Sequence, residues 1–264
     1  MTPTIRHATP VTPSNQQRIE EPMYTLTNVT KTYRKGQHSV TALDGLNLSI
    51  AAGEWLAIQG RTGSGKTTLL QLLGALDHPS SGVINFDGQD LARLPEADLT
   101  EARASSIGFV FQTFNLIPTL SAQENVEVAL IPQRLTAAER RERATEALAN
   151  VGLTDRANHL PSEMSGGQQQ RVGIARALVK APHVLLADEP TGNLDADTRD
   201  EIIALLETLW RDRGLTLVLV THDTTIARRA QRVATMHDGH LTIVTDERAQ
   251  PGPASGDRNR PGRQ

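Results

Sequence analysis

The sequence contains no cysteine among its 264 residues. Disulfide bonds and metal sites built on thiolates are therefore excluded, and the composition fits a reducing compartment. Long hydrophobic runs are missing as well, because no apolar stretch approaches the ~18 residues that a membrane-spanning helix needs. We therefore expect no membrane span within this sequence.

The sequence also has little excess charge, since 27 Lys and Arg stand against 30 Asp and Glu, for a net charge of -3. Without a global basic field, the chain is not expected to bind nucleic acid. Residues 1–22 are rich in Thr, Pro and polar side chains and show no apolar core of a signal peptide, so export is not expected. We expect one domain at 23–246 between disordered tails at 1–22 and 247–264.

The most specific pattern is the segment Gly60-Arg61-Thr62-Gly63-Ser64-Gly65-Lys66-Thr67, followed by Thr68. It reads G-x-x-x-x-G-K-[ST], the loop that surrounds nucleotide phosphates. Glycines let backbone N–H groups converge on an anion, and the helix that follows offers its free N–H groups and positive dipole end. Lys66 reaches the outer phosphates, and the Thr67 hydroxyl takes a Mg²⁺ position. Because the apolar run 55–58 precedes it as a strand, this segment predicts a phosphate-binding site.

Two acidic residues, Asp188 and Glu189, follow the apolar run 184–187. Such a run is typical of a parallel strand covered on both faces. At its exposed end, Asp188 is the candidate Mg²⁺ ligand, directly or through water. Glu189 is the candidate general base that polarises the attacking water. A solvated acidic strand end is the alternative, and the phosphate loop upstream favours catalysis.

A second glycine-containing segment runs from Met164 to Arg171 and contains Ser165, Gly166, Gly167 and Gln168. Two glycines open a predicted helix over 167–180, and Ser165 supplies a hydroxyl. The N–H groups at such a helix start again suit an anion. An ordinary loop before a helix is the alternative that the residues alone leave open.

The order of predicted elements defines an α/β fold with a helical insertion. Strands are predicted at 24–33, 43–50, 54–59, 83–86, 107–112, 184–187 and 215–220, with a hairpin formed by 233–236 and 241–244. Helical character extends over 113–180 and returns at 195–212. Capping boxes at Ser121–Glu124 and Thr136–Glu139 predict two helix starts within the insertion.

With these motifs in this order, the sequence resembles the ATP-binding cassette (ABC) ATPases over about Met23 to Asp246. The phosphate loop, the Ser-Gly-Gly-Gln signature segment (165–168) and the Asp-Glu pair carry the resemblance. It implies an α/β fold with a RecA-like P-loop NTPase core, an antiparallel β subdomain and an α-helical subdomain inserted at about 113–180. It also implies that ATP and Mg²⁺ are bound.

The resemblance assigns roles to further residues. Tyr33 stands where the family stacks an aromatic ring on adenine, and Gln112 where a glutamine touches Mg²⁺ and the water. His222 matches the switch histidine that contacts the γ-phosphate, and Asn193–Asp195 matches a loop that crosses the dimer interface. The expected catalytic residues are thus Glu189, His222 and Lys66, and the expected metal-site residues are Thr67, Gln112 and Asp188.

The family mechanism implies an ATP-dependent homodimer. The phosphate loop of each subunit faces the signature segment of the other, so two subunits close head to tail over two ATP molecules and reopen after hydrolysis. The resemblance further implies a separate membrane permease as partner. The subunit would lie in the cytoplasm, peripheral on the inner face of the cell membrane.

Segments 109–118 and 186–195 are similar to the lipoprotein-releasing and macrolide-exporter branch, which implies export of macrolides or antimicrobial peptides, or lipoprotein release by force transmission. The apolar residues Phe114, Leu116, Ile117 and Leu120 either line the groove for a permease's coupling helix or belong to the core of the helical lobe. A non-transport regulator of the cell-division type, acting through a membrane partner, remains the alternative function.

Overall fold

The structure is a computed structural model that describes residues 22–36 and 38–244. The tails predicted at 1–22 and 247–264 lie outside these residues, except for Pro22, which begins the first strand. Among the described residues, no helix is both long enough and apolar enough to cross a membrane.

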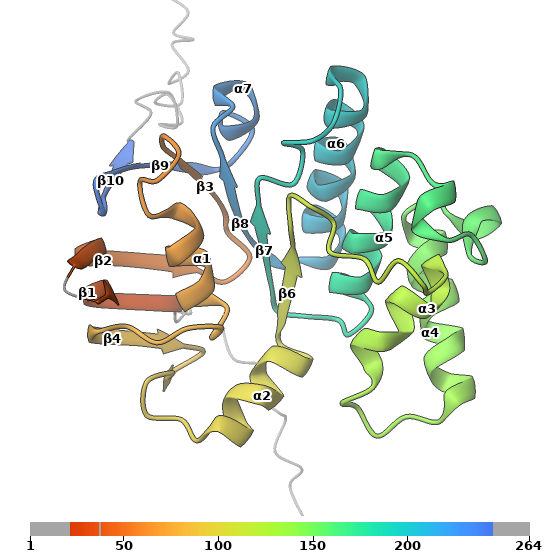
Figure 1. Cartoon of the computed structure of the whole chain (residues 1–264), viewed down its shortest axis with the longest axis horizontal. Helices are drawn as coiled ribbons and strands as arrows, with labels where there is room; N and C mark the ends of the chain where they lie inside the picture. Colours follow the sequence, from red (N-terminus) through yellow and green to blue (C-terminus); the bar gives the residue numbers. More distant parts are fainter. Residues whose placement is uncertain (1–21, 37, 245–264) are drawn as a thin grey trace, which may run out of the picture.

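Two sheets form the β framework (Figure 1). The antiparallel sheet has the order β2-β1-β4-β5, with strands β1 (Pro22–Lys35), β2 (His38–Ala51), β4 (Ser81–Phe86) and β5 (Gln89–Asp90). The second sheet has the order β10-β9-β3-β8-β7-β6, with strands β3 (Trp55–Gln59), β6 (Ile107–Val110), β7 (Val184–Asp188), β8 (Thr216–Thr221), β9 (Arg232–His237) and β10 (His240–Val244). In the second sheet all neighbours pair in parallel, except β10, which is antiparallel to β9.

The helices divide between the two sides of the second sheet (Figure 1). They are α1 (Lys66–Leu73), α2 (Glu96–Ser105), α3 (Ala122–Glu127), α4 (Ala137–Asn150), α5 (Gly166–Leu178), α6 (Ala196–Arg213) and α7 (Thr224–Ala227), with 3-10 turns at Val128–Leu130, Thr154–Arg156 and Pro161–Glu163. Helices α3 and α4 lie at the end of the molecule opposite the antiparallel sheet, next to α5.

Side chains of the parallel strands alternate between two cores. Trp55, Leu185 and Leu217 pack with residues of α3 to α6, whereas Leu56 and Val218 pack with α1 and the antiparallel sheet. Since successive strand residues point to opposite faces, a strand covered on both sides must be apolar throughout. The predicted α/β class, with an antiparallel β part and inserted helices, is confirmed.

Two helix starts and one hairpin turn lie where the sequence predicts them. Ser121 and Thr136 each form the predicted capping box and begin α3 and α4. The β9–β10 hairpin turns at Asp238 and Gly239, with φ of 46° and 80°. Both values are positive, as a two-residue hairpin turn of this kind requires.

Several segments differ from the predictions, and the short elements β5 and α7 are among those not predicted. Helix α2 was not predicted, because Leu99 is its only buried residue and its only large apolar side chain, which gives no helical periodicity. Helical structure within 113–180 begins only at Ala122. The residues before it are irregular, and Phe114 and Asn115 have positive φ of 60° and 49°. The Arg176 side chain of α5 holds both their carbonyl groups, with hydrogen bonds of 2.7 and 2.6 Å.

Candidate functional site

Four adjacent parallel strands carry predicted residues at their carboxyl ends. The phosphate loop follows β3, His222 follows β8, Asp188 ends β7, and Gln112 lies just beyond β6. The strand pairs are in register at these ends, since Gln59 of β3 pairs with Thr221 and Asp188 pairs with Val220. Ligands of open α/β sheets bind at this edge. The topology therefore brings these groups together from distant parts of the sequence.

A hollow of about 470 Å³ lies at this edge. It is lined by Ala42, Thr62, Gly63, Gly65, Lys66, Thr67, Thr68, Gln112, Asp188, Glu189 and His222. All except Ala42 are among the predicted site residues. Ala42 comes from β2 of the antiparallel sheet, and no sequence pattern marked it.

The N-terminus of α1 is open to the hollow. No side chain caps α1, whereas α3, α4, α5 and α6 each have a side-chain cap. Its cap residue Gly65 has φ of 107°, and a Cβ there would lie 2.4 Å from the Ala42 carbonyl oxygen, so only glycine fits. The first N–H groups of a helix have no partner within it. An anion in the hollow would supply those partners.

Lys66 places a cation against this loop. Its Nζ donates hydrogen bonds to the carbonyl oxygens of Gly60 and Arg61 at 2.9 and 3.0 Å. It also lies 4.0 Å from Glu189 Oε1, and its side chain is 7% exposed. A buried ammonium group has a strong preference for an anionic partner, so Lys66 suits a phosphate group entering the hollow.

The buried hydroxyl of Ser64 has no hydrogen-bond partner among the described residues. A Cβ on Gly60 would lie 2.7 Å from that hydroxyl and 2.4 Å from the Met236 carbonyl oxygen. The loop is thus closely packed on its inner side. Gly60 is required there for lack of space, and not for a positive φ.

Asp188 and Thr67 both line the hollow, and the Thr67 hydroxyl lies close enough to the Asp188 carboxyl group to affect its pKa. Burial raises the pKa of Asp188, and the nearby Glu189 charge adds to this effect, while Thr67 and Lys66 oppose it. A divalent cation would reverse the effect by stabilising the ionised form. Carboxylate and hydroxyl oxygens are hard ligands, so the residues present fit Mg²⁺ held together with phosphate oxygens.

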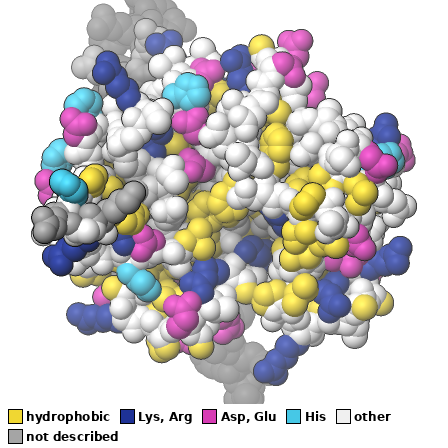
Figure 2. Space-filling model, in the orientation of Figure 1, with side chains coloured by type: hydrophobic (Ala, Val, Ile, Leu, Met, Phe, Trp, Pro, Cys, Tyr) yellow, Lys and Arg dark blue, Asp and Glu magenta, His cyan; other side chains and the backbone are white. Residues whose placement is uncertain are grey.

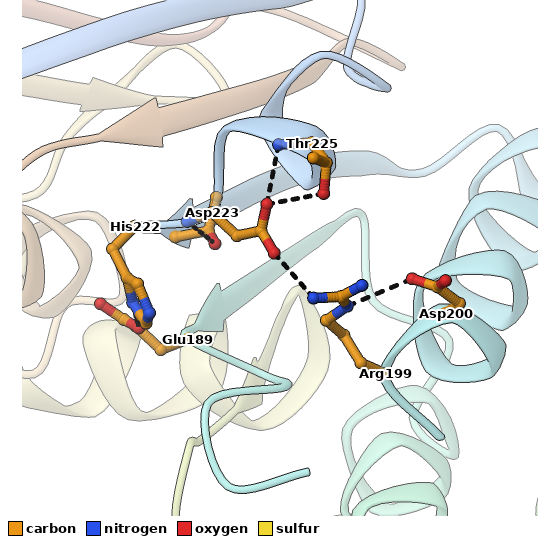
Figure 3. Close-up of polar contacts among 7 residues, drawn as sticks. Glu189, Arg199, Asp200, His222, Asp223 and Thr225 are labelled. Carbon is orange, nitrogen blue, oxygen red and sulfur yellow. Dashed lines mark hydrogen bonds and ion pairs between the residues drawn. The ribbon is translucent and has the colours of Figure 1, made fainter. Parts of the chain in front are cut away.

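Glu189 lies between two basic side chains. Its Oε2 contacts His222 Nδ1, as Figure 3 shows, while its Oε1 faces Lys66. Its backbone φ is 46°, which is uncommon for a residue with a side chain. The side chain is 17% exposed. A carboxylate that lines the hollow beside a lysine and a histidine suits a general base for water.

The signature residues do not line this hollow. Ser165 caps α5, where its Oγ accepts from the Gln168 N–H at 3.3 Å and its own N–H donates to Gln168 Oε1 at 3.0 Å. The Ser165 hydroxyl proton stays available to an acceptor, and the residue is exposed. Gly167 packs on α6, since a Cβ there would lie 2.4 Å from Thr198 Cγ2. The signature segment is therefore separate from the hollow of its own chain, and its contact with a nucleotide stays a prediction.

Tyr33 also lies outside the lining of the hollow. Its hydroxyl donates to Asp77 Oδ2 at 3.1 Å, and Lys31 Nζ lies 4.9 Å from its ring centroid. The ring is 40% exposed. Its contact with adenine stays a prediction.

Sequence reasoning missed the ion pair between Arg199 and Asp223, which are 24 residues apart. Figure 3 shows this pair beside Glu189 and His222. Asp223 follows a predicted residue directly, but Arg199 stands in a charged helix face with no pattern of its own.

A phosphate loop after β3, an acidic pair at the end of β7 and a histidine after β8 define a P-loop nucleoside triphosphatase. Residues 43–192 match the family described as ABC transporter. The chain belongs to the ABC transporter family and is an ATPase of that family.

Its similarity to named relatives extends beyond the matched segment. The ABC transporter ATP-binding protein YvrO of Bacillus subtilis (strain 168) is 48% identical over 226 residues, covering 86% of this chain and 97% of YvrO. The macrolide export ATP-binding/permease protein MacB of Azoarcus sp. (strain BH72) is 44% identical over 233 residues, covering 88% of this chain. The chain spans only 34% of that MacB.

Solved structures show the same fold. A dimeric, post-hydrolysis structure of the ATP-binding cassette MJ0796 bound to ADP and Pi has a TM-score of 0.78 at 44% sequence identity. The similarity covers 85% of this chain and 100% of that chain. MJ0796 comes from Methanocaldococcus jannaschii.

Proposed function

We propose that the protein is the motor subunit of an ABC transporter of the export or force-transmitting type, with its cassette unit at about 23–246. A hollow lined by a phosphate loop, a buried lysine and an acidic pair carries this proposal. The similarity to MacB, named for macrolide export, supports the export branch. Macrolides, antimicrobial peptides and released lipoproteins are the candidate substrate classes.

In this proposal ATP binds with its phosphates over the free N–H groups of the loop, and Lys66 neutralises the outer phosphates. Thr67, Asp188 and Gln112 would hold Mg²⁺, which would neutralise negative charge on the phosphates. Glu189 accepts a proton from the attacking water, and His222 orients Glu189 and contacts the γ-phosphate. All these residues line one hollow, which supports such a mechanism.

The same proposal includes a head-to-tail homodimer. Ser165, Gly166, Gly167 and Gln168 lie at the start of α5, outside the hollow of their own chain. They are exposed or partly exposed, except Gly167. Because both sites suit anions, a second copy's signature segment completes the nucleotide site in trans. The dimeric MJ0796 structures support this arrangement.

A separate membrane permease is the proposed partner, and it would hold the subunit at the inner face of the cell membrane. Figure 2 shows hydrophobic side chains gathered over the helical part of the molecule. On the described chain, Ile117 and Ile131 are 39% and 64% exposed, while Leu116 packs against the core. Next to them, a hollow is lined by Phe109, Phe111, Asn115, Ala129, Arg176, Ala177 and Lys180. An exposed apolar surface of this kind supports a protein partner.

Affinity purification from detergent-solubilised membranes, with mass spectrometry of the co-purified proteins, tests the partner. A permease with few membrane helices and a large extracytoplasmic domain is expected. A cell-division membrane protein in its place would move the subunit to the regulatory class. ATP-dependent dimerisation without a membrane partner would contradict the transport role.

A further inference from the structure

An ion pair ties the first turn of α6 to the segment that carries His222. Arg199 Nη1 lies 3.1 Å from Asp223 Oδ2, and the two side chains are 31% and 23% exposed. Figure 3 shows the neighbours His222 and Asp223 diverging at the end of β8, His222 toward Glu189 and Asp223 toward Arg199. The pair therefore constrains the backbone on which His222 stands.

Asp223 is held on its other sides as well. Its Oδ1 accepts hydrogen bonds from the Thr225 N–H at 2.7 Å and the Thr225 hydroxyl at 2.6 Å. Its own N–H donates to Thr221 Oγ1 at 3.0 Å. The hydrogen bonds from Thr225, with the charge of Arg199, hold the pKa of Asp223 below its usual range, so the carboxylate is ionised at neutral pH.

Arg199 lies in the first turn of α6, a helix start that is held by backbone and side-chain hydrogen bonds. Its N–H donates to the Asp195 carbonyl oxygen at 2.8 Å. Asp195 caps α6 by accepting from the Thr198 N–H at 3.0 Å. Arg199 also pairs with Asp200 at 3.2 Å, which orients its guanidinium group. The Arg199–Asp223 ion pair thus connects the well-capped first turn of α6 to the loop that carries Asp223.

We propose that Arg199 and Asp223 form a positioning pair for ATP hydrolysis. The pair holds the backbone next to His222 against α6. It thereby keeps the His222 side chain in contact with Glu189 and facing the hollow. The inference rests on the proposed function, because it assigns Glu189 and His222 to hydrolysis. Neither Arg199 nor Asp223 lines the hollow. The pair therefore acts on the rate of the chemical step and not on ATP affinity.

The test is steady-state ATP hydrolysis by Arg199→Gln, Asp223→Asn and the double variant of the full chain. Asparagine keeps one oxygen to cap α7 and replaces the charged oxygen that faces Arg199 with a neutral NH2 group, so it removes the ion pair but keeps the cap. Each single variant is expected to lower kcat about tenfold or more, since a small misplacement of a catalytic group costs up to ~10²-fold. KM for ATP is expected to stay within about twofold. The double variant should lose no more than either single variant, because the two act as one unit.

Two further variants separate positioning from folding. Arg199→Lys keeps a cation near Asp223 and is expected to recover most of the lost kcat. Arg229→Gln is the matched control, because Arg229 also joins the chain beyond α7 to α6, through a 2.6 Å pair with Glu207. It is expected to keep the wild-type kcat. If Arg199→Gln does not fold, the kcat and KM of Asp223→Asn and Arg199→Lys test the inference in its place.

A wild-type kcat in Arg199→Gln or Asp223→Asn would overturn the inference. So would an equal loss in Arg229→Gln, no recovery in Arg199→Lys, or losses that multiply in the double variant. These outcomes leave the proposed function intact as long as the wild-type chain hydrolyses ATP. A wild-type chain without ATPase activity would instead overturn the proposed function itself.

Discussion

Gln170 Nε2 donates a 2.6 Å hydrogen bond to the carbonyl oxygen of Pro190, and the Gln170 side chain is fully buried. Pro190 directly follows Glu189, whose φ is 46°. The bond therefore anchors the uncommon backbone of the candidate base to helix α5. Because α5 begins at the signature segment, one helix joins two parts of the proposed mechanism.

Replacing this donor tests the anchor. Gln170→Leu leaves the Pro190 carbonyl without its partner, which is expected to cost about 1–3 kcal/mol of stability and to lower kcat. Urea unfolding and ATPase assays measure the two effects. Gln169→Leu is the control, since Gln169 donates to the carbonyl oxygen of Met164, just before its own helix begins. Equal kcat losses in the two variants would refute a specific role for Gln170.

Glu189→Gln tests the assignment of the general base. Glutamine keeps the shape but accepts no proton from water, so hydrolysis is expected to fall by at least ~10²-fold while ATP still binds. The ATP-bound dimer should then persist in size-exclusion chromatography. A variant that remains monomeric with ATP would contradict the head-to-tail dimer.

Ser165→Arg tests the signature segment in trans. A large cation at this exposed position is expected to block closure of the dimer and so abolish hydrolysis. ATP binding to the monomer, measured by titration calorimetry, should stay unchanged because Ser165 does not line the hollow of its own chain. Loss of monomer binding would instead place Ser165 in its own subunit's site.

Lys180 predicts a pH effect on stability. Burial lowers the pKa of Lys180 to about 8, whereas an unfolded lysine titrates near ~10.4. Between these values the unfolded chain binds more protons, so this group makes stability rise with pH; below about pH 8 its buried charge destabilises the fold throughout. Lys180→Met removes this pH-dependent contribution to stability.

The gain in unfolding free energy of Lys180→Met over wild type should therefore be largest at pH 7 and shrink toward pH 10. Urea unfolding at several pH values measures it. A difference that does not change with pH would show that Lys180 titrates alike in the folded and unfolded chains.

Most of the residues that line the hollow were predictable because they follow buried strands, whose apolar runs are plain in the sequence. Asp188 and Lys66 are examples. The left-handed backbone at Phe114 was not predictable, since the Arg176 side chain that supports it lies 62 residues further along the chain. Helix α2 was missed because it buries only Leu99. Contacts between distant, partly exposed polar groups leave no periodic trace in a sequence.

The contact between Gly167 and Thr198 limits how the subunit can deform. A Cβ added at Gly167 would lie only 2.4 Å from Thr198 Cγ2, so no side chain fits between the first turns of α5 and α6. Interiors so tightly packed transmit displacement instead of absorbing it. We therefore expect the signature segment and the first turn of α6 to move together. In a closing dimer, each subunit would engage its partner's nucleotide with both segments in one step.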